Sequence, residues 1–403
     1  MILQQAFEQV MEEWQSRITS DDGSIARHDA IPLDSSATHA TIISGIRRCG
    51  KSTLLMQFYR QLNEPAVYIN FEHPLLMDFD TADYQRLDRV IEQSGAKWLL
   101  LDEIQVLPKW EVYVRQKLDQ RYKVVITGSN ASLLSRELGT HLTGRHIPME
   151  LFPFSYEEFL VLKLLPTSHE TFREYLFTGG FPEYIKTGDS RQLITLFQDI
   201  IYRDIIVRYG IKDVASMQRL ATFLLQNVGN KFSAAKLKQA VSVNAVNTIL
   251  NWCNYLENSY MFFFVEKFSY SVRSQMVSPK KIYAIDTGLA YSLSTHVMTN
   301  EGHLLENLVF IALRRRYTQI YYFDGKGECD FVVTNHGAPL HLIQVCVELT
   351  PDNLQREIAG LEEAMRELFI KKGFIITENQ NDCFETKAGI IHVLPFAQLK
   401  DVL

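Results

Sequence analysis

The sequence predicts a multidomain α/β protein that contains a parallel sheet covered by helices on both faces. Short apolar runs alternate with helical patterns between residues 39 and 130, and most of these runs are apolar throughout, as buried parallel strands are. The length of 403 residues also exceeds one ordinary domain and predicts two or three of them. These two observations favour an α/β core followed by further domains.

The expected elements support this class in chain order. An amphipathic helix is expected over residues 5–18, because Phe7, Val10 and Trp14 recur at helical spacing. Further on we expect strands at 40–44, 66–71, 97–101 and 123–127, and helices at 51–62, 84–94 and 112–120. After Pro153 helical periodicity dominates to about residue 256, and short strands return towards the end of the sequence. We therefore divide the chain into domains at 1–150, 151–230, 231–290 and 291–403.

Composition and charge exclude several classes of protein. A net charge of −6 gives no overall field towards nucleic acid or anionic membranes. The longest apolar runs, such as residues 261–265, are far shorter than the ~20 residues that span a bilayer. The first residues lack a basic segment before an apolar one, so we expect no signal peptide. Five scattered cysteines without a C-x-x-C pair predict neither disulfides nor a zinc site, and hence a cytoplasmic protein.

A phosphate-binding loop is predicted at residues 45–52, whose sequence GIRRCGKS fits the pattern G-x-x-x-x-G-K-[ST]. The loop follows an apolar strand and opens a helix, which is the setting that the motif requires. Gly45 and Gly50 let successive backbone N–H groups face phosphate oxygens. Lys51 supplies a point charge for the β- and γ-phosphates, and Ser52 supplies a hydroxyl ligand for Mg²⁺.

Two carboxylates end the third predicted strand. The apolar run of residues 97–101 leads directly into Asp102 and Glu103, the Walker B arrangement. A strand of the same sheet delivers Asp102 to the edge where Mg²⁺ binds, and Glu103 can orient and polarise the attacking water. An acidic pair after a strand is common by itself, but this one follows a phosphate-binding loop. The pair therefore predicts hydrolysis as well as binding.

Four more residues are assigned to the site from their positions. Asn130 follows the fourth predicted strand and is placed against the γ-phosphate or the attacking water; a turn-capping residue is the alternative. Arg145 lies in a short turn and is assigned to the transition-state charge; a solvated surface arginine is the alternative. Arg48 and Thr53, within and just after the loop, complete the nucleotide-binding set.

The motif-bearing stretches keep their order over nearly the whole chain, at residues 43–55, 68–72, 101–105, 127–130, 142–145, 153–159, 179–183, 202–205 and 281–289. In them the chain resembles the prokaryotic AAA-type ATPases that carry a winged helix and a C-terminal domain related to restriction endonucleases. The resemblance implies a P-loop core, a helical lid and these two domains in turn. It also implies ATP and Mg²⁺ as cofactors and hydrolysis between subunits of a ring or partial ring, and therefore a homo-oligomer.

One proline is carried over from this resemblance. The run Gly180-Phe181-Pro182 is similar to the G-x-P turn that related signalling ATPases place over the adenine. The resemblance assigns Pro182 to nucleotide binding, and a plain helix–turn proline is the alternative.

A helix, a turn, a second helix and a strand are predicted over residues 232–268, as in a winged helix. We expect the second helix to bury one stripe and to expose a polar face, with Val246, Ile249, Leu250, Cys253 and Leu256 inside and Asn244, Asn247, Thr248, Asn251 and Asn254 outside. Asparagine can bind adenine edges. The outward face carries no Lys or Arg, however, and phosphate neutralisation supplies most of the affinity for DNA. We therefore favour a packing or coupling role over DNA binding.

The last domain resembles a PD-(D/E)xK nuclease in its element order and acidic positions. Glu306, Asp330 and Gln344 fall where such enzymes place metal ligands, and Cys346 falls where they place the lysine. A thiol cannot supply an ammonium charge, although Lys326 in a nearby turn is a candidate replacement. We favour a degenerate domain used for binding or scaffolding over an active nuclease.

The leading functional hypothesis is an AAA-type ATPase that couples its nucleotide state to rearrangement of domains or subunits. One alternative is an ATP-dependent enzyme that processes nucleic acid with a C-terminal nuclease. The other is a nucleotide-gated switch that binds a protein partner. ATP is the expected ligand, DNA or protein is the candidate partner, and no membrane partner is expected.

Overall fold

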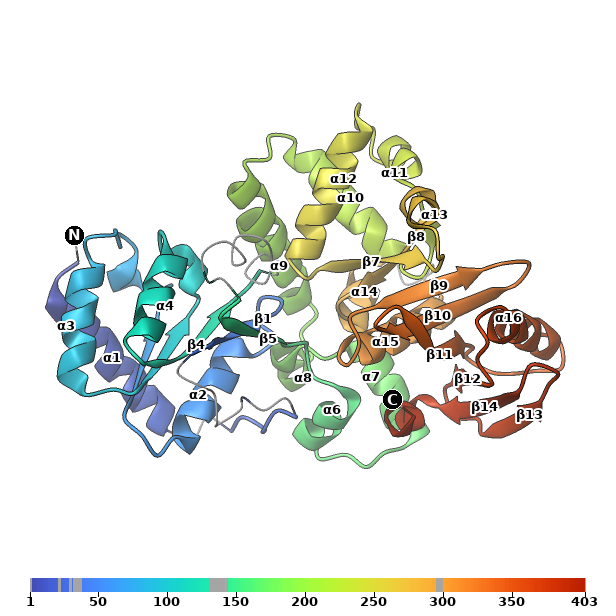
Figure 1. The fold of residues 1–403 in the computed structure, drawn as a ribbon, viewed down its shortest axis with the longest axis horizontal. Coiled ribbons are helices and arrows are strands. Elements are labelled where there is room, and N and C mark those ends of the chain that lie inside the picture. Colours follow the sequence, from blue (N-terminus) through green and yellow to red (C-terminus); the bar gives the residue numbers. More distant parts are fainter. Residues whose placement is uncertain are drawn as a thin grey trace. The chain divides into compact units, whose positions relative to one another are not determined.

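The computed structural model describes residues 2–20, 23–28, 31, 38–130, 142, 144–294 and 300–402. The chain divides into two compact units, Met1–Phe152 and Pro153–Leu403 (Figure 1). Within the described residues, none of the helices has both the length and the apolar character that crossing a bilayer requires. The further division of the second unit at residues 230 and 290 stays a prediction.

In its described part, the first unit is built on a parallel sheet with the strand order β2-β3-β4-β1-β5. The strands are β1 (Ala40–Ser44), β2 (Ala66–Asn70), β3 (Trp98–Asp102), β4 (Lys123–Gly128) and β5 (His146–Glu150). In the register of the pairs, Ser44 faces Gly128 and Asn70 faces Asp102. All five strands are parallel, so their carboxyl ends meet at one edge of the sheet.

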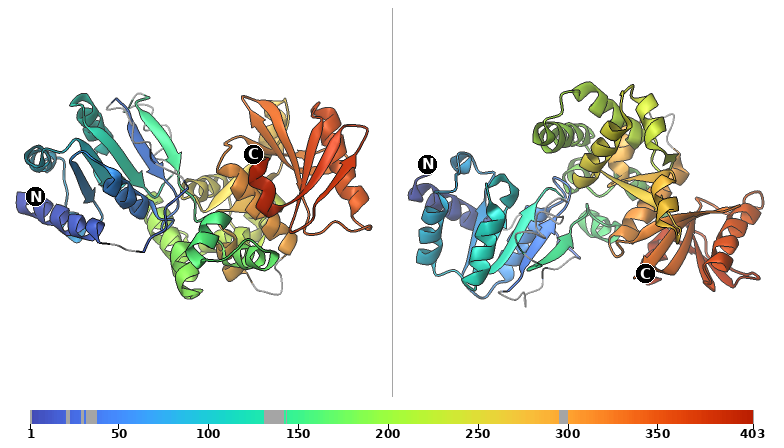
Figure 2. Two further views of the ribbon diagram at one scale, coloured as in Figure 1. Left: turned by 90° about the horizontal axis from the view of Figure 1, so that it is seen from below. Right: turned by 45° about the horizontal axis from the view of Figure 1, so that its top comes forward.

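Helices cover both faces of this sheet, as the fully buried pattern of β1 and β3 requires. The helices are α1 (Gln4–Thr19), α2 (Lys51–Gln61), α3 (Tyr84–Ser94) and α4 (Trp110–Asp119), with short 3₁₀ turns η1 (Pro74–Leu76) and η2 (Ile104–Val106). The connection from β1 to β2 through α2 runs in one direction across the sheet. The connections from β2 to β3 through α3 and from β3 to β4 through α4 run in the opposite direction. Right-handed crossovers therefore place α2 on one face and α3 and α4 on the other (Figures 1 and 2).

The expected elements of the first unit are confirmed, with shifts of one or two residues at their ends, and one strand was missed. Phe7 and Val10 of α1 are buried in the sheet core, and Trp14 packs partly against it. β5 escaped the sequence analysis because it is an edge strand without a fully buried residue and contains Pro148, which fits an edge only.

The second unit begins with helices and ends in a large sheet. Its first elements are α6 (Tyr156–Lys163), α7 (His169–Thr178), α8 (Pro182–Thr187), α9 (Arg191–Asp199), the π-helix η4 (Ile200–Val207), α10 (Val214–Gln226), α11 (Ala234–Ala240) and α12 (Val246–Asn258). The later helices are α13 (Val272–Val277), α14 (Thr287–Leu293), α15 (Glu301–Arg314), α16 (Leu354–Glu367) and the 3₁₀ helix η6 (Phe396–Asp401).

The described strands of this unit form one sheet in the order β13-β14-β12-β11-β10-β9-β7-β8-β6. They are β6 (Lys231–Phe232), β7 (Phe262–Lys267), β8 (Lys280–Ala284), β9 (Ile320–Asp324), β10 (Glu328–Asn335), β11 (Ala338–Val345), β12 (Lys372–Thr377), β13 (Asp382–Glu385) and β14 (Ile390–Pro395). β7 pairs with β9, so the strands before and after residue 290 share a sheet, whose C-terminal strands appear in orange and red in Figure 2.

The buried stripe of α12 differs from the one expected. Ile249, Trp252 and Leu256 are buried, whereas Val246 and Leu250 are 38% and 47% exposed. Trp252 displaces the predicted stripe because the largest apolar side chain takes the position that faces the core. The exposed asparagines of α12 are confirmed, and they share their face with two apolar side chains.

Two glycine-containing segments of the second unit, residues 178–180 and 286–289, cross in close contact. The Asp286 carboxylate accepts hydrogen bonds from the backbone N–H groups of Gly180, at 2.6 Å, and Leu289, at 2.8 Å. Burial raises the pKa of Asp286 to about 6, although these N–H groups oppose the rise. A side chain at Gly288 would overlap the carbonyl group of Thr178, so the two segments can approach only through glycine.

We expect Gly288→Ala to lower the free energy of unfolding of the second unit by about 2–3 kcal/mol, because the new methyl group must push the backbone of Thr178 away. Urea unfolding followed by circular dichroism measures the change. Gly302→Ala is the matched control, since its methyl group would meet only side-chain atoms of Asn300 and Val347. Equal stability of the two variants would contradict the close approach.

Candidate functional site

The loop of residues 45–50 connects the end of β1 to the start of α2 and needs its two glycines for different reasons. Gly50 has a φ of +102°, a left-handed conformation that side chains other than hydrogen disfavour. A Cβ at Gly45 would overlap the carbonyl oxygen of Leu151. One glycine therefore allows the turn into the helix, and the other allows the loop to lie against β5.

Lys51 is held across this loop. Its Nζ lies 3.0 Å from the carbonyl oxygen of Gly45 and 3.1 Å from that of Ile46, and its residue is 4% exposed. The same Nζ lies 3.9 Å from Oε1 of Glu103. The ammonium group is thus positioned between the loop backbone and a carboxylate from another strand.

Arg27 supports the loop from the preceding connector, and the sequence analysis did not identify it. Its guanidinium donates to the carbonyl of Cys49 at 2.8 Å and to the carbonyl of Phe152 at 2.7 Å. Burial raises the pKa of the Cys49 thiol, which therefore stays neutral while it contacts the carbonyl of Leu151. These contacts fix the backbone of the loop at its sharpest turn.

Asp102 is the buried centre of the site. The end of β3 delivers its carboxylate, which accepts hydrogen bonds from the Tyr68 hydroxyl at 2.6 Å, the Asn70 amide at 2.8 Å and the Thr127 hydroxyl. Burial raises the pKa of Asp102, and the charge of Glu103 raises it further. Hydrogen bonds from Thr127, Tyr68 and Ser52 act in the opposite direction, so Ser52 and Asp102 meet as expected.

Thr127 joins the two carboxylate residues. Its hydroxyl donates to Oδ1 of Asp102 and accepts the backbone N–H of Glu103 at 3.0 Å. Glu103 adopts a left-handed conformation with a φ of +53°, and Gln105 donates to its Oε2. Because β4 lies between β1 and β3, the end of β4 brings Thr127 beside both residues. The sequence analysis missed Thr127, Tyr68 and Asn70. Polar side chains near strand ends were the available signal for Thr127 and Asn70, whereas Tyr68 lies in the middle of β2.

The smaller assignments lie at the same edge of the sheet. Asn130 follows β4 and is 1% exposed, and Thr53 is half-buried in the first turn of α2. Arg48 is exposed and has a φ of +63°, while its neighbour Arg47 pairs with Glu72 at 3.3 Å. Contacts of these residues with a nucleotide stay predictions.

Arg145 lies at the opposite edge of the sheet. It immediately precedes β5, whose first residue pairs with Ala40 at the start of β1. Its guanidinium donates to the carbonyl of Thr38 at 2.9 Å and to the carboxylate of Asp119 at 2.6 Å. The length of β1 separates these contacts from the loop within the chain, and a role towards another subunit stays a prediction. Thr143 of the same motif lies outside the described residues.

The residues at the P-loop edge fit a magnesium-bound triphosphate. A buried carboxylate whose pKa is raised by burial is stabilised by a nearby cation, and the hydroxyl of Ser52 lies beside it. Mg²⁺ usually takes few protein ligands and completes its octahedron with phosphate oxygens and water. Ser52 and Asp102 match this requirement without a larger protein cage.

The acidic positions predicted in the last domain also come together. Glu306 and Asp330 both contact Nζ of Lys281 at 2.8 Å. Gln344 accepts the backbone N–H of Asp330 at 3.2 Å and donates to Glu357 at 2.7 Å. Across the described ranges, no group of three or more His, Cys, Asp or Glu side chains is arranged to hold a metal ion.

Cys346, at the position of the nuclease lysine, and Lys326, its candidate replacement, make other contacts. The Cys346 thiol donates to the carbonyl of Glu348 at 3.0 Å. The backbone N–H of Lys326 donates to Glu363 at 3.0 Å in an exposed turn. Sequence reasoning missed Lys281, which its place in a mostly apolar strand concealed.

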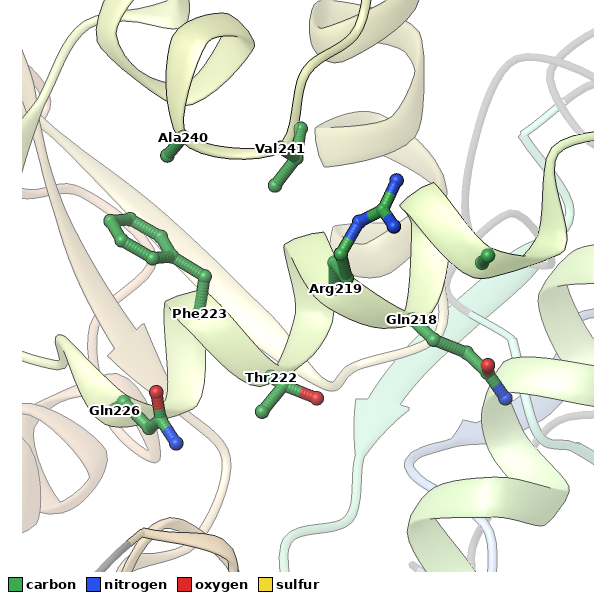
Figure 3. Close-up of a pocket in the computed structure, with 8 residues that line it drawn as sticks. Gln218, Arg219, Thr222, Phe223, Gln226, Ala240 and Val241 are labelled. Atoms are coloured by element: carbon green, nitrogen blue, oxygen red, sulfur yellow. The ribbon is translucent and has the colours of Figure 1, made fainter.

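A groove of about 490 Å³ lies elsewhere in the second unit, between α10 and the end of α11. Phe223 of α10 faces Ala240 and Val241, and Arg219 lies one turn away (Figure 3). None of the residues that line this groove belongs to the predicted sites.

Comparison with known proteins assigns the first unit. The family model described as an AAA domain matches residues 37–160, and a model of a domain of unknown function matches residues 169–299. The uncharacterized protein MJ1544 of Methanocaldococcus jannaschii is 31% identical over 88% of this chain and 86% of its own length. The chain belongs to this AAA-domain family. An uncharacterized protein of Haemophilus influenzae is also 31% identical, over 77% of this AAA-domain chain and 83% of its own.

Two solved structures are similar at a low level. Cdc6p from Pyrobaculum aerophilum is 12% identical, with a TM-score of 0.26 over 76% of this chain and 93% of that one. A DNA polymerase III gamma subunit-related protein from Thermotoga maritima is 10% identical, with a TM-score of 0.26 over 62% and 99%. At these TM-scores the two likenesses carry no weight for fold or function. The AAA-domain match and the parallel sheet identify an AAA-type P-loop protein, which binds nucleotide.

We expect Thr127→Val to lower the free energy of unfolding by about 1–3 kcal/mol, because a buried carboxylate and a buried N–H group each lose a hydrogen-bond partner. Thr127→Ser keeps the hydroxyl and serves as the control, with a smaller loss from the missing methyl group. Chemical unfolding of both variants measures the difference. A valine variant as stable as the serine variant would show that the hydroxyl does not hold Asp102.

Proposed function

We propose that the chain binds ATP with Mg²⁺, hydrolyses it, and couples its nucleotide state to rearrangement of domains or subunits. The observation that carries the proposal is the convergence of Lys51, Ser52, Asp102 and Glu103 at one edge of a parallel sheet. Each of these groups has a distinct task in phosphoryl transfer, and their spacing in the fold suits one bound triphosphate.

Binding is assigned to the loop and the start of α2. Backbone N–H groups of residues 45–52 face the phosphates, and the N-terminus of α2 adds its partial positive charge. The Lys51 ammonium, which now contacts two loop carbonyls, exchanges them for β- and γ-phosphate oxygens. Ser52 and Asp102 hold Mg²⁺, which neutralises charge on the phosphate oxygens when it is bound.

Turnover is assigned to Glu103. Its carboxylate orients a water molecule for attack on the γ-phosphate and polarises that molecule. The backbone of Glu103 is fixed by Thr127, and Gln105 holds one of its carboxylate oxygens. This support leaves the second oxygen, which lies 3.9 Å from Lys51, facing the place where the phosphates bind.

The remaining assignments extend the site. Asn130, buried at the same edge, is placed against the γ-phosphate or the water. Pro182, which begins α8, is assigned to the adenine by resemblance. Arg145 is directed away from the loop of its own chain, which supports a role at the site of a neighbouring subunit in a homo-oligomer.

The other proposed functions find less support. The exposed face of α12 carries asparagines and apolar side chains and offers no phosphate-neutralising charge, which disfavours DNA as the partner. The nuclease alternative needs an open metal site in the C-terminal part, and the carboxylates there already hold an ammonium. A protein partner for the nucleotide-dependent rearrangement is therefore the favoured output.

We expect Lys51→Ala to weaken ATP binding by about 100-fold, because it removes a charge-assisted contact to the phosphates. Glu103→Gln should retain binding and reduce turnover by about 10²–10⁴-fold, because an amide cannot act as a base. Fluorescent-nucleotide titration and phosphate release measure the two effects. The controls are Lys97→Ala and Glu92→Gln, which change exposed residues of the same types. A Glu103→Gln protein with normal turnover would remove the assignment of the base.

The proposed role of Arg145 is tested by mixing subunits. Arg145→Ala and Glu103→Gln proteins should each be inactive, and their mixture should regain part of the ATPase activity, because some interfaces then combine an intact Arg145 with an intact Glu103. Asp119→Ala is the matched control, since it breaks the same ion pair within the chain. If Asp119→Ala loses as much activity as Arg145→Ala, the arginine acts through the stability of its own chain.

A further inference from the structure

A buried lysine occupies the centre of a carboxylate cluster in the second unit. Nζ of Lys281 lies 2.8 Å from Oε1 of Glu306, 2.8 Å from Oδ1 of Asp330 and 2.8 Å from Oε1 of Glu328. An ammonium group has three protons, so each carboxylate can accept one of them. The lysine side chain is 3% exposed, and those of Glu306 and Asp330 are 10% and 9% exposed.

The carboxylates are oriented by further donors that aim them at the lysine. The Tyr283 hydroxyl donates to Oε1 of Glu306 at 2.6 Å, and the backbone N–H of Val345 donates to Oδ2 of Asp330 at 2.9 Å. Lys231 contacts the other oxygen of Glu328 at 2.9 Å. Burial by itself lowers the pKa of Lys281, but the surrounding ionisable groups outweigh it and hold the pKa well above its usual value. The ammonium is therefore charged at neutral pH.

The donor set does not fit the metal that a PD-(D/E)xK nuclease requires. Such a site needs acidic or carbonyl oxygens turned towards an open ion and a separate lysine near the reacting phosphate. The carbonyl oxygen of Gln344 is turned to the backbone N–H of Asp330, and its amide is held by Glu357. Position 346 offers a thiol, whose pKa is raised by burial. The chain thus has the two acidic positions but fills the space between them with its own cation.

We propose that the Lys281 ammonium is the resident cation of the Glu306–Asp330–Glu328 cluster and replaces the divalent metal of a nuclease centre. The cluster then fastens β8 to the helix α15 and to β10, a strand that β9 and β7 separate from β8 in the sheet. On this proposal, removal of the ammonium would leave carboxylate oxygens without a cation, and a small rearrangement would let them take up a divalent ion that the natural sequence excludes.

Metal titration of nucleotide-free protein tests the proposal, with Mn²⁺ as the probe and electron paramagnetic resonance to count the bound ion. We expect Lys281→Ala to bind one more Mn²⁺ per chain than the wild-type protein, and Lys281→Ala/Asp330→Asn to lose that ion. Lys280→Ala is the matched control, because Lys280 is the adjacent lysine and pairs with Glu266 at the surface, outside the cluster. The proposal is overturned if the wild-type protein binds Mn²⁺ in a manner that Asp330→Asn abolishes, or if Lys281→Ala gains no ion.

Thermal unfolding provides a second measurement. Lys281→Ala should unfold about 5–10 °C below the wild-type protein, because carboxylates are left buried without a partner. Mn²⁺ should raise the Tm of this variant and leave that of Lys280→Ala unchanged. Replacement of the three most buried charges of the cluster, in Lys281→Met/Glu306→Gln/Asp330→Asn, should recover most of the loss. A triple variant no more stable than Lys281→Met alone would contradict a charge-based joint.

A third measurement needs only folded wild-type and Asp330→Asn proteins. We expect neither to cleave supercoiled plasmid or linear duplex DNA with Mg²⁺ or Mn²⁺. Cleavage by the wild-type protein that disappears in Asp330→Asn would overturn the proposal and make Lys281 the lysine of an active nuclease. All three measurements are made without ATP, so their outcome does not depend on the proposed ATPase.

Discussion

A carboxylate without solvent contact at the end of β3 is the constraint around which the first unit is organised. Asp102 is fully buried, and an isolated charge there would be strongly disfavoured. Hydroxyl and amide donors from β2, from β4 and from the start of α2 surround it. Asn70 and Thr127 lie at or next to the ends of their strands, Ser52 lies in the first turn of α2, and Tyr68 reaches the carboxylate from the middle of β2. Because the start of α2 is one of these segments, the same contacts also position the phosphate-binding loop that precedes it.

The parts of the first unit that could be predicted from sequence are those that depend on local residue patterns. Apolar runs predicted four strands, and glycine and lysine in a fixed pattern predicted the loop. The partners of Asp102 could not be predicted, because Tyr68, Asn70 and Thr127 are its neighbours only through the order β2-β3-β4-β1. Local patterns do not encode which strands lie side by side. Arg27 escaped for a related reason, since a long side chain from a connector reaches carbonyl groups distant in sequence.

In the second unit, too, some residues of a cluster could be predicted from sequence and their partner could not. The acidic positions Glu306 and Asp330 were predicted and do meet, because their helix and strand follow a recognisable order. The sequence analysis named only Lys326 as a candidate source of an ammonium group, and the ammonium comes instead from Lys281 on β8. Lys281 follows Lys280 at the start of β8, so in sequence the two resemble a solvated strand end, and only the packing of α15 against the sheet reveals that Lys281 is buried. Trp252 changed the stripe of α12 in a similar way, through packing.

The two carboxylate clusters of this chain reach charge balance by different means, and the difference decides what each can bind. Around Asp102 the hydrogen-bond donors are hydroxyl and amide groups, and the ammonium of Lys51 contacts loop carbonyls and lies 3.9 Å from Glu103. That arrangement suits the proposed function, in which a cation arrives with a triphosphate. Around Asp330 the ammonium is built into the chain and cannot leave. The cluster around Asp102 is therefore suited to bind and release a cation, whereas the cluster around Asp330 keeps the cation that the chain itself supplies. Both clusters are built on acidic residues near the end or start of a buried strand.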